Sequence, residues 1–143
     1  MKIFLDTNII LDVLVKREPY YIDSARIWTL VKEKSIQGYI SAITINNFYY
    51  IIKKLKNSKI AENFIDEILD DFEVVPLTKD ILRQSRTIPG KDYEDSIQYF
   101  SAINTGCQFL ITRNKKDFIS TGLNIISPTE FLKTISGEAF SKT

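Results

Sequence analysis

The sequence contains no histidine, and this absence excludes several kinds of active site. A Ser-His-Asp triad, a Cys-His pair, a histidine-ligated zinc site and a histidine general base all require the imidazole ring. Any chemistry that the chain performs must therefore use carboxylates, hydroxyls, amides and lysines.

Cysteine and long apolar runs are also scarce. The single cysteine, Cys107, excludes a disulfide within the chain and suits a reducing compartment. The apolar start of the sequence ends at Asp6, too early for a signal peptide, and no run approaches the roughly 20 residues of a membrane-spanning helix. We therefore expect a soluble, cytoplasmic protein that makes no membrane contact.

The chain has almost no net charge, since 19 basic residues face 18 acidic ones. A nucleic-acid partner would have to be bound by local basic patches. The 143 residues, 44% of them hydrophobic, suffice for one globular domain with its own core. We expect this domain to span residues 1–136 and residues 137–143 to form a flexible tail.

Short β-type runs alternate with longer runs that have helical apolar spacing. The expected strands are 2–5, 38–41, 72–77, 108–112 and 124–127. The expected helices are 7–17, 22–35, 43–56, 58–70, 78–87, 93–105 and 128–135. This alternation predicts a three-layer α/β fold, in which a central parallel sheet of four to five strands is flanked by helices.

Polar side chains follow several of these strands, where parallel folds collect ligands. Asp6 follows the first strand, Asn47 lies on the helix after the second, and Asp117 follows the strand at 108–112. Asp95 opens the helix that leads to that same strand. The topology is expected to bring these distant residues to one edge of the sheet.

Each acidic residue also has an ordinary explanation as a helix cap. Asp6 can cap the helix that starts at residue 7, and Asp92 and Asp95 suit a first helical turn. Asn114 with Asp117 three residues later resembles a capping box. Taken singly, these residues favour capping over catalysis.

Taken together, Asp6, Asp95 and Asp117 indicate a metal site. Three carboxylates that share one cleft repel one another and raise their own pKa values. Mg²⁺ or Mn²⁺ removes this conflict, because both ions prefer carboxylate and water oxygens. Such an ion also activates water, which suits a chain without histidine.

Four segments of the chain together resemble the PIN domain, the nuclease fold of VapC-type toxins in prokaryotic toxin–antitoxin systems. They are FLDTNIILD, ISAITINNFYYIIKK, DYEDSIQYFSAINTGCQFLITRNKKDF and ISPTEFL. The resemblance covers nearly the whole chain. It implies a ribonuclease in which Asp6, Asp95 and Asp117 hold Mg²⁺ or Mn²⁺ and whose products carry 5′-phosphate and 3′-hydroxyl ends. It also implies an antitoxin protein as partner and a homodimer.

The chain departs from the family pattern at Asn47, where many members carry a glutamate. Asparagine offers an amide oxygen but cannot carry charge or act as a base at neutral pH. We expect Asn47 to belong to the catalytic site of a branch that has asparagine here. The alternative is a PIN-like module that binds RNA or a protein without cutting it.

The remaining candidates surround these residues. Thr7, Thr112 and Asn114 are expected to position water or the scissile phosphate, with Asp92 as an outer helper. The candidate RNA-binding residues are Arg113, Lys115 and Lys116 beside Asp117, and Lys53, Lys54 and Lys56 at the end of the Asn47 helix. The alternative interpretation is that these lysines are merely solvated.

Two other folds with an aspartate after the first strand fit less well. A haloacid-dehalogenase-type phosphotransferase needs a second aspartate two residues later, where this chain has Asn8. A receiver domain needs a phospho-acceptor aspartate after the third strand, where Thr78, Lys79 and Asp80 have the pattern of a helix start.

Overall fold

The computed structural model describes residues 1–88, 91–118 and 122–141, with side chains up to residue 137 in the last helix. Its strands are β1 (Lys2–Leu5), β2 (Gln37–Ser41), β3 (Glu73–Val75), β4 (Phe109–Ile111) and β5 (Asn124–Ile126). Its α-helices are α1 (Thr7–Leu14), α2 (Tyr21–Lys32), α3 (Ala42–Leu55), α4 (Ser58–Asp71), α5 (Lys79–Ser85), α6 (Tyr93–Asn104) and α7 (Pro128–Ser141). A short 3₁₀ helix, η1, spans Lys115–Asp117.

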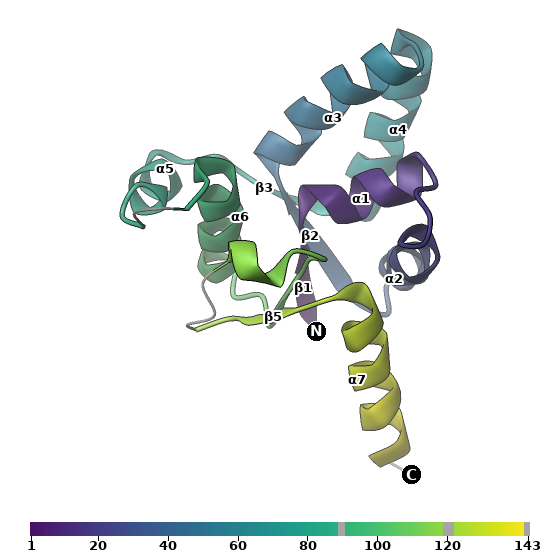
Figure 1. Ribbon diagram of the computed structural model, residues 1–143, viewed down its shortest axis with the longest axis vertical. Helices are drawn as coiled ribbons and strands as arrows, with labels where there is room; N and C mark the ends of the chain where they lie inside the picture. The colour runs from purple at the N-terminus through teal and green to yellow at the C-terminus, as the bar shows by residue number, and fades with distance from the viewer. Residues whose placement is uncertain (89–90, 119–121, 142–143) are drawn as a thin grey trace.

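The five strands form one parallel sheet in the order β3-β2-β1-β4-β5 (Figure 1). Every neighbouring pair is parallel, and Ile3 of the central strand pairs with Gly38 on one side and Phe109 on the other. The predicted α/β fold with a central parallel sheet is therefore confirmed. Because β1 is central, the residue after it, Asp6, lies in the middle of the carboxyl edge.

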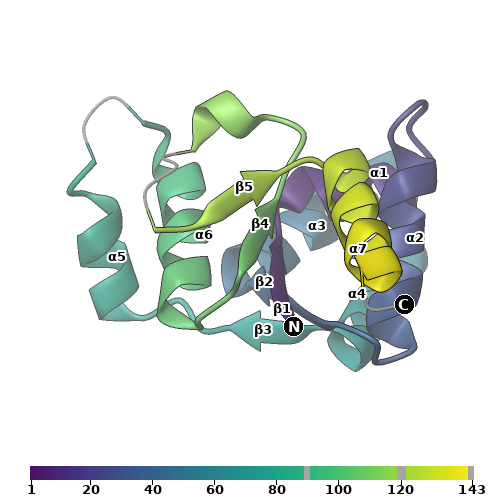
Figure 2. The ribbon, with the colours of Figure 1, turned by 90° about the horizontal axis from the view of Figure 1, so that it is seen from below.

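Both faces of the sheet are covered by helices. Side chains alternate along a strand, so Ile3 and Leu5 enter one apolar core and Phe4 enters the other. The Ile3 side packs against α1, α2, α3, α4 and α7, and the Phe4 side packs against α5 and α6. Figure 2 shows the sheet between these two groups of helices. Burial of the sheet on both faces thus explains why the strand sequences are apolar at consecutive positions.

Several elements are shorter than the sequence pattern predicts, among them the first helix and the third strand. The first helix ends at Leu14 rather than at 17, because Lys16 adopts a left-handed φ of 51° that no α-helix accommodates. The third strand is Glu73–Val75 rather than 72–77. Phe72 still donates its backbone N–H to Ile68 at the end of α4, and Pro76 has no N–H for the strand ladder.

The last helix is longer than expected, since α7 continues to Ser141 instead of ending at 135. The helix therefore includes residues 137–141 of the expected flexible tail, and the boundary between domain and tail stays a prediction. Residues 142–143 of that tail lie outside the described part of the chain. Of the described residues, no helix combines the length and the apolar character that a membrane crossing requires.

Candidate active site

Asp6 occupies the N-cap position of α1, yet its side chain is used elsewhere. It makes no capping hydrogen bond to this helix, all of whose residues are described. Its Oδ2 instead accepts a hydrogen bond of 2.8 Å from the Thr112 hydroxyl, at the end of β4. Asp6 is only 3% exposed, and this burial raises its pKa, while hydrogen-bond donors of Thr112, of Gln98 and of the backbone at Thr7 and Asn8 oppose the rise. Helix capping alone therefore does not explain the surroundings of the Asp6 carboxylate.

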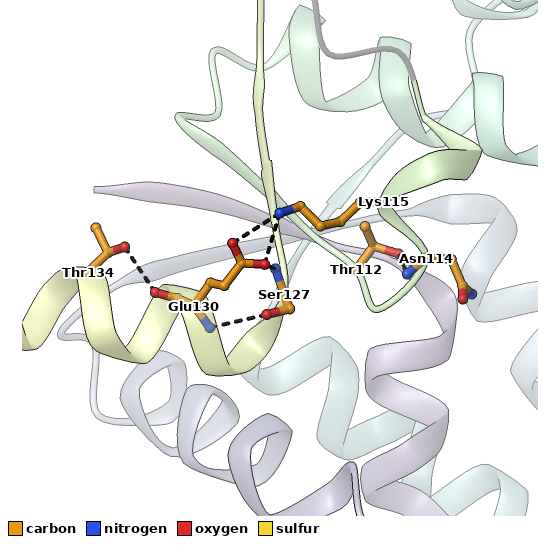
Figure 3. Close-up of polar contacts among 6 residues, drawn as sticks. All are labelled: Thr112, Asn114, Lys115, Ser127, Glu130 and Thr134. Carbon is orange, nitrogen blue, oxygen red and sulfur yellow. Dashed lines mark hydrogen bonds and ion pairs between the residues drawn. The ribbon is translucent and has the colours of Figure 1, made fainter.

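Thr112 connects this carboxylate to the loop that follows β4. Its side chain is fully buried, and its Oγ1 also accepts a hydrogen bond of 3.1 Å from the backbone N–H of Asn114 (Figure 3). Two hydrogen bonds, to the Asp6 carboxylate and from the Asn114 backbone, thus hold the Thr112 side chain beside the acidic residues. Asn114 contributes its backbone to this arrangement.

Thr7 joins three helices just beside Asp6. Its backbone N–H donates to Gln98 Oε1 of α6 at 3.1 Å, and its hydroxyl lies 2.8 Å from the Thr44 hydroxyl of α3. Gln98 and Thr44 are buried. Because α1, α3 and α6 are tied at this point, the polar residues at their ends are held around one space.

That space is a cavity of about 420 Å³ at the carboxyl edge of the sheet. It is lined by Asp6, Thr7, Asn8, Leu11, Asn47, Tyr50, Ile51, Glu94, Asp95 and Gln98. Four of the residues singled out in the sequence therefore meet here: Asp6, Thr7, Asn47 and Asp95. Among the described residues, no lysine or arginine belongs to the lining.

Asp117 and Asp92 lie next to Asp95 but outside this lining. Asp117 ends η1 and shares a small crevice with Asp95 and Lys91. Asp92 caps α6, where its Oδ1 accepts a hydrogen bond of 3.2 Å from the backbone N–H of Asp95. The capping interpretation is therefore correct for Asp92.

The charges around Asp95 oppose its ionisation. Partial burial together with the charges of Asp6, Asp92, Asp117 and Glu94 raises the pKa of Asp95 to about 7. All these potential donors are oxygen atoms, which is the donor type that Mg²⁺ and Mn²⁺ prefer. The chemistry of the donor set thus fits such an ion. As the side chains stand, the described residues include no group of three or more acidic or cysteine side chains close enough to hold one metal.

Glu94 is the residue that sequence reasoning missed. Its Oε1 accepts a hydrogen bond of 3.0 Å from the Asn47 side-chain amide, so α6 and α3 are joined across the cavity. Glu94 and Gln98 are four residues apart and share one face of α6. That spacing is a signal that could have identified Glu94, because both residues face α1 and α3.

Arg113 is engaged in an ion pair. Its guanidinium binds both carboxylate oxygens of Asp12 on α1, at 2.8 and 3.2 Å, and lies 4.3 Å from the centre of the Tyr20 ring. Asp12 is fully buried and also lies 3.4 Å from Arg17. Arg113 thus connects the loop after β4 to α1. Its role in RNA binding stays a prediction.

The predicted basic residues near the site differ in their surroundings. Lys115 Nζ binds both carboxylate oxygens of Glu130 at 2.9 and 3.0 Å, and Glu130 forms a reciprocal capping pair with Ser127 at the start of α7 (Figure 3). The backbone carbonyl of Lys116 accepts a hydrogen bond from Lys91 Nζ. The lysines at the end of α3 are exposed: Lys53, Lys54 and Lys56.

A family model described as PIN domain matches residues 2–116. The chain belongs to the PIN domain family. Its relatives include Ribonuclease VapC1 of Aquifex aeolicus (strain VF5), 27% identical over 135 residues that cover 91% of this chain and 92% of that protein.

Solved structures show the same fold as this PIN domain. DNA-bound VapBC from Salmonella typhimurium superposes with a TM-score of 0.68 at 19% identity, covering 90% of this chain and 98% of that chain. VapBC-1 from nontypeable Haemophilus influenzae superposes with a TM-score of 0.67 at 22% identity, covering 90% of this chain and 99% of that chain. VapC20 of Mycobacterium tuberculosis, described as a sarcin-ricin loop cleaving toxin, superposes with a TM-score of 0.62 at 15% identity. The match covers 76% of this chain and 86% of that chain.

Proposed function

We propose that this PIN domain is a metal-dependent endoribonuclease and the toxin of a toxin–antitoxin pair. The observation that carries the proposal is the cavity in which Asp6 and Asp95 meet without a lysine or arginine in its described lining. Partial burial and the charges of the neighbouring carboxylates raise the pKa of Asp95, which is consistent with a site that takes up a cation. The likeness to a ribonuclease of the VapC type supports RNA as the substrate.

In this proposal Asp6, Asp95 and Asp117 hold Mg²⁺ or Mn²⁺. When bound, the ion supplies positive charge that activates water and stabilises the charge on the reacting phosphate. The chain's own residues prepare the site. The Thr112 hydroxyl fixes the orientation of the Asp6 carboxylate, and the bonds of Thr7 hold the helices that carry Asn47 and Asp95. The reaction cleaves the bond between phosphorus and the 3′ oxygen, leaving a 5′-phosphate and a 3′-hydroxyl.

The proposed partners are RNA, a cognate antitoxin and a second copy of this chain. Solved structures with this fold include VapBC complexes, which supports the antitoxin. Tyr20 and Tyr50 are 41% and 63% exposed and are available for contacts, whereas Trp28 belongs to the core. A strict monomer in light scattering at micromolar concentration would contradict the homodimer.

The experiment that tests the proposed reaction is RNA cleavage after complete removal of divalent ions. We expect the chelated protein to be inactive on a mixed RNA substrate, and added Mn²⁺ to restore cleavage with 5′-phosphate ends. Cleavage that survives excess chelator would contradict the mechanism. RNA binding without cleavage at any Mn²⁺ concentration would instead support the non-cutting module.

A further inference from the structure

The hydrogen bond between Asn47 on α3 and Glu94 on α6 indicates a role for Asn47. The Asn47 amide donates to Glu94 Oε1 at 3.0 Å, and both side chains line the cavity that contains Asp6 and Asp95. A side-chain amide that donates its N–H to a carboxylate orients that carboxylate and favours its charged form. Asn47 therefore acts on a carboxylate that lies inside the site.

Glu94 has surroundings that a solvated helix-start glutamate would lack. It is partly buried, and its Asn47 partner comes from a different layer of helices. Acidic residues in a first helical turn need no such partner, because the helix dipole alone favours them.

We propose that Glu94 contributes a carboxylate to the divalent-cation site and that Asn47 is its positioning residue rather than a ligand. This inference rests on the proposed metal-dependent function. It gives the two residues roles that differ from those expected from the sequence, where Asn47 was placed in the catalytic site and Glu94 was not. Negative charge on this side of the cavity is thus supplied by α6 instead of α3.

The direct test measures Mn²⁺ affinity by calorimetry, without RNA, for wild type and Glu94→Gln. The substitution keeps the size of the side chain and removes its charge. We expect Mn²⁺ affinity to fall at least about tenfold, as loss of a group at a metal site typically causes. Glu62→Gln is the matched control, because Glu62 is exposed on α4, and it should bind Mn²⁺ like wild type.

A second variant reverses the pair. Asn47→Asp combined with Glu94→Gln keeps both side-chain lengths and moves the carboxylate from α6 to α3. We expect this double variant to recover part of the affinity that Glu94→Gln loses. Wild-type affinity in Glu94→Gln, with the chain folded, would overturn the assignment of Glu94.

A double-mutant cycle tests the role of Asn47. If Asn47 acts through Glu94, Asn47→Ala weakens Mn²⁺ binding in the wild type and has no further effect in Glu94→Gln. Equal losses in both backgrounds would overturn the positioning role. Failure of the proposed function has a different signature, because the wild type itself would then neither bind Mn²⁺ nor cut RNA.

Discussion

Partial burial and the charges of neighbouring carboxylates oppose the ionisation of Asp95, and this gives the protein a pH dependence. Its pKa is about 7 in the folded chain against 3.8 ordinarily. The unfolded chain therefore loses this proton near pH 4, and the folded chain keeps it until about pH 7. A raised acid pKa in the folded state lowers stability as pH rises through this window, and the full cost is present above it.

We therefore expect Asp95→Asn to raise the melting temperature in the presence of chelator, and to raise it more at pH 8 than at pH 4.5. The amide removes the charge that the neighbours repel but keeps the size of the side chain. Thermal unfolding at both pH values measures the difference. An equal gain at pH 4.5 and pH 8 would show that Asp95 is not the titrating group.

The buried Asp12 depends on Arg113 for its charge balance. Arg113→Met removes two hydrogen bonds and leaves Asp12 with only the 3.4 Å contact to Arg17 among its described partners. Leaving a buried charge without its partner is costly, and we expect a loss of about 3 kcal/mol in the free energy of unfolding.

Urea denaturation of Arg113→Met measures this loss. Arg26→Met is the control, because the Arg26–Asp23 pair spans 3.9 Å with both side chains substantially exposed. Such surface pairs contribute under about 1 kcal/mol. A similar small effect in both variants would contradict the structural role assigned to Arg113.

At the scale of the elements, β2 can pack closely against its neighbours only because residue 38 is glycine. A Cβ atom at Gly38 would lie 2.8 Å from side-chain atoms of both Phe72 and Val31. Both neighbours are core residues, and Phe72 packs edge-on against Trp28 with ring centres 5.2 Å apart. The contact between β2, α2 and the end of α4 is therefore fully packed.

We expect Gly38→Ala to destabilise the fold by about 1–3 kcal/mol, the usual cost of overpacking a core. Gly137→Ala on α7 is the matched control, since its new Cβ meets no atom within 4 Å and alanine favours helix. Chemical denaturation compares the two. Equal stability of Gly38→Ala and wild type would mean that Phe72 and Val31 can move aside.

The elements that sequence reasoning predicted well are those with a strong repeating pattern. The alternation of strands and helices was enough to predict that Asp6 and Asp95, which are distant in sequence, lie at one edge of the sheet, where both line the cavity. The Asn47–Glu94 contact could not be predicted in this way. It depends on how α3 and α6 are rotated towards each other, which periodicity within one helix does not specify.

Single residues were harder to assign, because capping and site chemistry use the same residue types. Asp6 and Asp92 both precede a helix, yet Asp92 caps α6 and Asp6 bonds to Thr112. The difference is set by the neighbouring strand, since β4 brings the Thr112 hydroxyl to Asp6. No local sequence pattern contains that information.

Across the whole molecule, a net charge of +1 conceals a separation of charge. The cavity is acidic, and exposed lysines gather where α3 meets α4, including Lys53 and Lys54. If these lysines contact RNA phosphates, RNA affinity falls as salt rises.

We expect the double variant Lys53→Gln/Lys54→Gln to reduce the slope of log affinity against log salt by up to about 1.4, or about 0.7 per lost phosphate contact on single strands. Fluorescence anisotropy with labelled RNA and chelator measures the slope. Lys79→Gln on α5 serves as the control. An unchanged slope in the double variant would support lysines that are merely solvated.

In our proposal, the carboxylates at the edge of the sheet form the active site of an RNA-cutting PIN domain. The most direct test is Mn²⁺-dependent RNA cleavage by Asp95→Asn and by Asp80→Asn, an exposed aspartate on α5. We predict that Asp95→Asn remains folded and loses at least about a hundredfold in rate, while Asp80→Asn cuts like wild type. A folded Asp95→Asn variant that cuts RNA at the wild-type rate would contradict the claim.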